Sequence, residues 1–111
     1  MNTASGKAKG RRLQQLVRDL LLKLHPSLEE DDIKSTAMGQ GGEDVQLSPA
    51  ARKLIPYTIE CKARKSVSVY PWYEQAMANN PKNHIPVLVI KQDRKKPLVV
   101  VDAEWFFERT K

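Results

Sequence analysis

Two nearly continuous apolar runs in the second half of the chain constrain its fold more than any other feature. The first spans Ile85 to Lys91 and the second spans Leu98 to Val101, with a polar turn over residues 92–97 between them. Strands that are covered on both faces show such runs, whereas a strand with one solvated face alternates polar and apolar residues. The sequence therefore predicts two strands that are buried on both faces and a sheet that is covered by helices.

A basic amphipathic helix is predicted before the first strand. Apolar residues recur at helical spacing from Gly10 to about His25, and Pro26 ends the pattern. Residues 1–9 are small, polar and basic, so we expect a flexible tail there. The remaining residues, 10–111, are enough for one domain with a modest core but not for two.

Shorter signals place the other elements. Ser48 followed by Pro49 is typical of a helix start, and Asp102 can cap a final helix. The expected elements are a short helical turn over residues 27–32, a loop over 34–42, strands over 44–47 and 57–63, a helix over 70–80 and a final helix through Trp105 and Arg109. The main order α, β, β, α, β, β, α predicts an α/β fold with a central mixed sheet flanked by helices.

The charge balance favours a polyanionic partner. Nineteen Lys and Arg residues stand against thirteen Asp and Glu residues, for a formal net charge of +6, and four of the acids are concentrated at residues 29–32. No apolar run approaches the length of a membrane span, so we expect no membrane contact and a cytoplasmic location. The single Cys61 excludes an internal disulfide and an all-cysteine zinc site.

The chemistry-bearing motif is Glu60-Cys61-Lys62, inside the second predicted strand. Side chains alternate along a strand, so Glu60 and Lys62 share one face and Cys61 faces the core. If the strand that starts at Asp44 pairs with this one as a hairpin, Asp44 lies beside Glu60. Two carboxylates and an ammonium group suit a divalent cation and a phosphate. An isolated Glu-x-Lys is also common on any solvated strand face, and that interpretation stays open.

With Asp44, Glu60 and Lys62 on consecutive strands after a basic helix, the chain resembles the PD-(D/E)XK nuclease superfamily. Its size and the Gly10-Arg11-Arg12 start of the helix are similar to Holliday-junction-resolvase-like and phage-encoded nucleases. The resemblance covers nearly the whole chain in element order but only a few positions in motif. It implies a restriction-endonuclease-like core.

The resemblance also implies roles for individual residues. Asp44 and Glu60 would bind Mg²⁺, with Mn²⁺ as a substitute, the carbonyl group of Cys61 would complete the metal shell, and Lys62 would be the catalytic lysine. The sequence departs from the pattern in two places. Glu43 stands at the proline of the motif name, and the helix offers Gln14 or Gln15 where the resolvase branch has a glutamate. Gln75, on the following helix, would orient Lys62 or contact phosphate.

The expected function is that of a Mg²⁺-dependent DNA endonuclease, acting on branched or duplex DNA as a homodimer, because paired cuts need two active sites. Basic and polar residues would hold the DNA backbone without reading its sequence. These candidates are Lys9, Arg11, Arg12, Arg18, Ser35, Arg64 and Lys65. The alternatives are a nicking, flap or restriction-like endonuclease on the same fold, or a DNA-binding module without catalytic activity.

Overall fold

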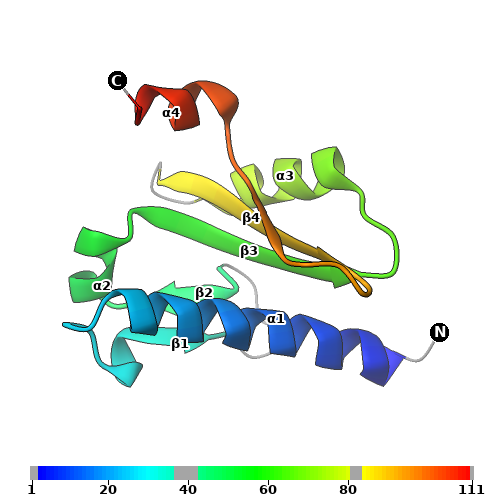
Figure 1. The fold of residues 1–111 in the computed structure, drawn as a ribbon, viewed down its shortest axis with the longest axis horizontal. Helices are drawn as coiled ribbons and strands as arrows, with labels where there is room; N and C mark the ends of the chain where they lie inside the picture. The colour runs from blue at the N-terminus through cyan, green and yellow to red at the C-terminus, as the bar shows by residue number, and fades with distance from the viewer. Residues whose placement is uncertain (1–2, 37–42, 81–83, 111) are drawn as a thin grey trace.

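The centre of the fold is a three-stranded mixed sheet with the strand order β3-β4-β5 (Figure 1). β3 (Tyr57–Arg64) and β4 (Ile85–Gln92) run parallel, whereas β5 (Leu98–Val100) runs antiparallel to β4. Parallel neighbours need a crossover connection, and helix α3 (Val69–Ala78) provides it. The structure, a computed structural model, describes residues 3–36, 43–80 and 84–110.

Helix α1 (Thr3–Leu24) packs on one face of the sheet. Its Leu13 and Val17 are buried in one cluster with Ile59, Cys61 and other residues from the same face of β3 and β4. Side chains alternate along a strand, so the residues between these, Thr58, Glu60 and Lys62, point to the opposite face. The two faces of β3 therefore have different roles.

Helix α3 covers the opposite face. It contacts both β3 and β4, and its Ala76 is buried. Leu88 and Ile90 of β4 are buried too, and they pair in register with Glu60 and Lys62 of β3. The predicted covering of β4 on both faces is thus confirmed, and the covering helix α3 stands over the face that carries the acidic motif.

A second, two-stranded sheet lies beside the first. β1 (Ile33–Ser35) follows the 3₁₀ turn η1 (Glu30–Asp32), and it pairs antiparallel with β2 (Val45–Leu47). The fully buried Ile33 and Val45 join the core cluster under α1. One helix therefore holds both sheets. The short helix α2 (Pro49–Leu54) then leads to β3, with the Ser48 hydroxyl group accepting a hydrogen bond from the Ala51 N–H as predicted for a cap.

The structure confirms the α/β class and the mixed sheet with flanking helices, but it corrects several details. Helix α1 begins at Thr3 rather than at Gly10, so residues 3–9 are helical instead of forming a tail. Alanines and lysines in this segment are strong helix formers, but the segment has no apolar residues at helical spacing that would predict a helix there. The predicted loop over residues 34–42 begins with strand β1, and residues 37–42 lie outside the described part.

Strand β5 is also different from the prediction. Leu98 and Val99 are 60% and 61% exposed, although their apolar run predicted a strand buried on both faces. β5 is an edge strand that packs mainly against β4, and among the described residues no helix packs extensively on its faces as α1 and α3 do on β3 and β4. The chain continues to helix α4 (Ala103–Glu108), whose first turn is capped by the Asp102 carboxylate, as predicted. None of the helices in the described segments is long and apolar enough to cross a membrane.

Candidate functional site

Asp44 is attached directly to the strand that carries the acidic motif. The Asp44 N–H donates to the Ile59 carbonyl oxygen over 3.0 Å, and the Cys61 N–H donates to Asp44 Oδ2 over 2.6 Å. The predicted hairpin between the two strands is wrong, because β2 forms its ladder with β1 and meets β3 only near its first residue. The expected neighbourhood of Asp44 and the Glu60-Cys61-Lys62 motif arises nevertheless, through these two hydrogen bonds.

The charges of Asp44, Glu60 and Lys62 act on one another. Glu60 is only 5% exposed, and its pKa is raised, mainly by burial and further by the negative charge of Asp44. The Asn79 side chain and the Lys62 ammonium group oppose this rise. Burial likewise raises the pKa of Asp44, while the Cys61 N–H, Lys62 and Arg64 lower it. Two carboxylates and two cationic side chains therefore share one electrostatic neighbourhood.

Two buried oxygens have no hydrogen-bond partner among the described residues. They are Glu60 Oε2, in the motif, and Gln14 Oε1, on α1. A buried polar atom without a partner costs free energy, and a bound cation is one way to satisfy it. Carboxylate and amide oxygens and a main-chain carbonyl are the ligands that Mg²⁺ accepts. The donor types thus fit a hard cation.

The number of charged ligands is small. Across residues 3–36, 43–80 and 84–110, no group of three or more His, Cys, Asp or Glu side chains gathers in a way that could hold a metal ion. The Cys61 thiol does not add a ligand, because it faces the core and burial strongly raises its pKa. A cation bound here would depend on Asp44, Glu60 and neutral oxygens.

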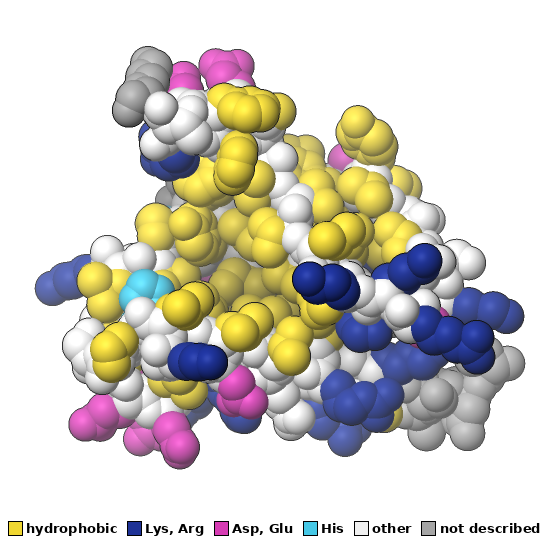
Figure 2. Space-filling view, viewed as in Figure 1, with side chains coloured by type: hydrophobic (Ala, Val, Ile, Leu, Met, Phe, Trp, Pro, Cys, Tyr) yellow, Lys and Arg dark blue, Asp and Glu magenta, His cyan; other side chains and the backbone are white. Residues whose placement is uncertain are grey.

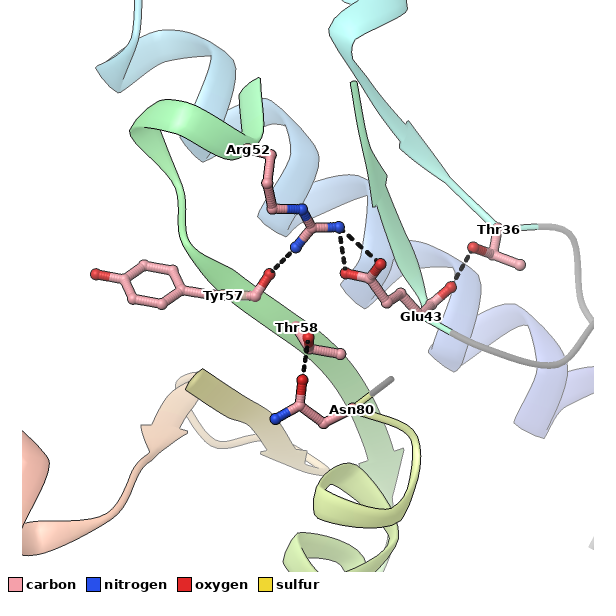
Figure 3. Close-up of polar contacts among 6 residues, drawn as sticks. All are labelled: Thr36, Glu43, Arg52, Tyr57, Thr58 and Asn80. Carbon is pink, nitrogen blue, oxygen red and sulfur yellow. Dashed lines mark hydrogen bonds and ion pairs between the residues drawn. The ribbon is translucent and has the colours of Figure 1, made fainter. Parts of the chain in front are cut away.

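A salt bridge from α2 fixes the residue before Asp44 (Figure 3). Arg52 Nη2 donates to both carboxylate oxygens of Glu43, at 3.0 and 2.7 Å, and Arg52 Nη1 donates to the Tyr57 carbonyl oxygen. On the other side, the Thr36 hydroxyl group donates to the Glu43 carbonyl oxygen. Arg52 thereby ties the start of β2 to the start of β3. The sequence does not predict this role, because no local pattern relates residues 43 and 52.

The end of α3 supplies polar groups whose role is also not predicted by the sequence. Gln75 is exposed, and it is Asn79, one turn later, that acts on Glu60. Its neighbour Asn80 accepts a hydrogen bond from the Thr58 hydroxyl group over 3.0 Å, which attaches the end of the helix to β3 (Figure 3). The two asparagines predicted only the end of a helix. Asn79 follows Gln75 by four residues and therefore lies on the same side of the helix, and this spacing is the sequence feature that could have indicated Asn79 as a site residue.

The basic candidates lie in several different surroundings. Arg64, the last residue of β3, and Lys65 after it are exposed, and Lys9 and Arg12 line a cavity of about 270 Å³ with Lys91. Lys9 is already paired there with Asp93, at 2.8 Å between Nζ and Oδ2.

The other basic and polar candidates lie in different surroundings. Arg11 is exposed on α1. Arg18 binds the Asp19 carboxylate and lines, with Ser35, a different hollow that includes Glu30 and Asp31. Three carboxylates and two cationic side chains, Arg18 and Lys34, line this hollow, so Arg18 and Ser35 are less available to a phosphate than the exposed Arg64 and Lys65.

Comparison of the chain with protein-family models, with curated proteins and with solved structures finds no match in any of the three.

Proposed function

We propose that the protein is a divalent-metal-dependent DNA endonuclease. The observation that carries this proposal is the joining of Asp44 to the Glu60-Cys61-Lys62 strand, where the two carboxylates act on each other beside cationic side chains and one buried oxygen of Glu60 has no hydrogen-bond partner within the described part of the chain. The sequence resemblance adds the substrate class, and the net charge of +6 agrees with a polyanion. A four-way junction is the first DNA structure to test, because the resemblance is to junction-resolving nucleases.

The chain's own residues would prepare the site in three ways. The Cys61 N–H holds one oxygen of Asp44, so that carboxylate has a fixed orientation. Asn79 and Lys62 favour the ionised form of Glu60 against its burial. Lys62 and the exposed Arg64 would attract a phosphate and offset the charge that develops on it during hydrolysis. Positioning and electrostatics therefore supply most of the catalysis in this proposal.

The implied cation is Mg²⁺, with Mn²⁺ as a substitute. Asp44 and Glu60 would hold it, with the Cys61 carbonyl oxygen as a neutral ligand between them. When bound, such an ion polarises a phosphoryl oxygen and makes a water molecule more acidic.

The test is cleavage of a labelled four-way junction and of a matched linear duplex, each with Mg²⁺ and with EDTA. We expect metal-dependent cutting that falls by about 10²-fold or more in Asp44→Asn and in Glu60→Gln. Glu74→Gln is the matched control, because Glu74 is exposed on α3 and loses a charge in the same way. Retained cleavage in the Glu60→Gln protein, with both variants folded, would contradict the assignment.

A second candidate function is a DNA-binding module without catalytic activity. It is favoured by the lack of a third acidic metal ligand among the described residues and by Gln14 on the first helix. The same experiment separates the two functions. Salt-sensitive binding of DNA without cutting, in Mg²⁺ and in Mn²⁺, would support the module.

A further inference from the structure

An apolar groove and a cationic cavity adjoin on the α1 side of the central sheet. The groove has a volume of about 560 Å³, with its floor on β3 and β4 and its walls on α1, β5 and α4 (Figure 2). The cavity, of about 270 Å³, is the one lined by Lys9, Arg12 and Lys91. Leu16 and Pro97 line both of them. The two together form one site with an apolar part and a cationic end, which we call the amphiphilic site.

The groove exposes large apolar side chains on both walls. Leu16, Leu20 and Leu24 project from α1, and Val99 and Phe106 line the opposite wall; all five are exposed. Among the described residues that line the groove, Arg109 is the only charged one. Pockets for small molecules typically have volumes of about 300–1,000 Å³ and a mainly apolar lining with few polar groups. The size and lining of the groove therefore suit a hydrocarbon chain.

The cavity that adjoins the groove carries more positive than negative charge. Asp93 is the one acid among the described residues that line it, and Lys9 Nζ lies 2.8 Å from Asp93 Oδ2. Arg12 and Lys91 form no salt bridge within residues 3–36, 43–80 and 84–110. Both cations can therefore donate charge-assisted hydrogen bonds to an anionic group placed there.

We propose that the amphiphilic site binds a single-chain anionic amphiphile of the fatty-acid class. The hydrocarbon chain of the ligand lies in the groove, and its carboxylate group lies in the cavity beside Arg12 and Lys91. Burial of the chain supplies most of the affinity, and the cations fix the direction in which the ligand lies. A DNA backbone fits this site less well, because it presents negative charge but no apolar chain to fill the groove.

The amphiphilic site and the candidate metal site lie on opposite faces of β3. Ala63 lines the cavity and belongs to the same core cluster as Cys61, and Lys91 is its partner in the register of β4. Ile59, two residues before Cys61, lines the groove. Because side chains alternate along a strand, Glu60 points to the other face. The inference therefore does not rest on the proposed nuclease activity.

The test is calorimetric titration of the purified protein with octanoate, decanoate and dodecanoate, and with the neutral decan-1-ol. The titrations are made at about pH 8, where carboxylates are ionised. We expect the dissociation constant to fall about fourfold for each added CH₂ group, as burial of the chain predicts. Decan-1-ol should bind about tenfold more weakly than decanoate, because it has no charge for the cationic end.

Two pairs of variants locate the ligand. Leu20→Glu should weaken decanoate binding about tenfold or more, because it places a charge in the wall of the groove. Leu54→Glu on α2 is its matched control, since Leu20 and Leu54 are 50% and 49% exposed and only Leu20 lines the groove. Lys91→Ala should weaken decanoate binding about fivefold and leave the binding of decan-1-ol unchanged. Its control is Lys95→Ala, because Lys95 is exposed on the following turn and does not line the cavity.

Circular dichroism establishes that each variant is folded, and Val99→Glu on β5 repeats the groove test if Leu20→Glu does not fold. A wild-type protein that binds none of the three carboxylates up to about 1 mM overturns the inference. Dissociation constants that do not depend on chain length overturn it as well, and so does decanoate binding that is unchanged in Lys91→Ala. The titrations need neither DNA nor metal, so their outcome is independent of whether the protein is a nuclease.

Discussion

Arg52 offers the sharpest test of how the candidate site is held together. Its guanidinium group joins the Glu43 carboxylate, directly before Asp44, to the carbonyl group of the first residue of β3. Replacing Arg52 with alanine removes the salt bridge and the hydrogen bond to Tyr57 together. We expect the Arg52→Ala protein to lose global stability and to hold Asp44 less firmly against β3.

The magnitude follows from the burial of the salt bridge. The Arg52 and Glu43 side chains are 22% and 18% exposed, so water screens the charges only in part. A hydrogen bond to a charged group contributes about 1.5–3 kcal/mol, and the variant leaves a half-buried carboxylate without its partner. We therefore expect a loss of about 2–4 kcal/mol in the free energy of unfolding. For a domain of this size, the melting temperature should fall by roughly 8–16 °C.

The assay is urea denaturation followed by tryptophan fluorescence, with Lys53→Ala as the control, because Lys53 is the exposed neighbour of Arg52 on α2. A double-mutant cycle with Glu43→Ala should give a coupling energy of about 1–2 kcal/mol between the two side chains. If Arg52→Ala costs no more than Lys53→Ala, or if the coupling energy is zero, the salt bridge does not stabilise the junction of the two sheets and the reasoning is refuted.

Three further predictions concern metal, DNA and protons. For a site that binds Mn²⁺ with a dissociation constant of about 1 mM, about 10 mM Mn²⁺ should stabilise the folded wild-type protein by roughly 1.4 kcal/mol in thermal melting. The Asp44→Asn protein should show no such gain in stability. In salt titrations of DNA binding, Arg64→Ala combined with Lys65→Ala should reduce the slope of log K against log salt by about 2; an unchanged slope removes both from the interface. The pKa of Asp32 is lowered, mainly by the hydrogen bond from the Ser48 hydroxyl group. The ionised Asp32 side chain therefore stabilises the fold at pH values above its ordinary pKa of 3.8. This contribution is lost as the pH falls through the lowered pKa. Asp32→Asn should therefore melt below wild type at pH 7 and match it in strong acid, and an equal difference at both pH values would show that the charge is not responsible.

The central sheet and its flanking helices could be predicted because their signals are local. Alternation placed Glu60 and Lys62 on one face of β3, and the apolar run of β4 required covering on both sides. β1 was missed because three residues, of which Ile33 is the only large apolar one, are too few to show a period. The exposure of β5 was missed for a different reason, since an apolar run does not show whether a partner covers it.

The candidate site was only partly within reach of the sequence. The adjacency of Asp44 and Glu60 was expected from a hairpin, whereas it comes from two hydrogen bonds at the place where β2 meets β3. The Arg52 salt bridge and the action of Asn79 on Glu60 join residues that are far apart along the chain. Contacts of this kind depend on the tertiary fold, and no periodicity in the chain records them.

The alternation of β3 also limits how this chain can change during evolution. One strand presents Ile59 to the core under α1 and Glu60 to the candidate site, so its two faces can accept substitutions independently. An insertion or deletion of one residue within β3 would exchange the faces, placing the carboxylate against α1 and the isoleucine in the site. A change of two residues would preserve the faces but move the Cys61 N–H away from Asp44. We therefore expect the length of this strand to be maintained across descendants of the gene even where its amino acids differ.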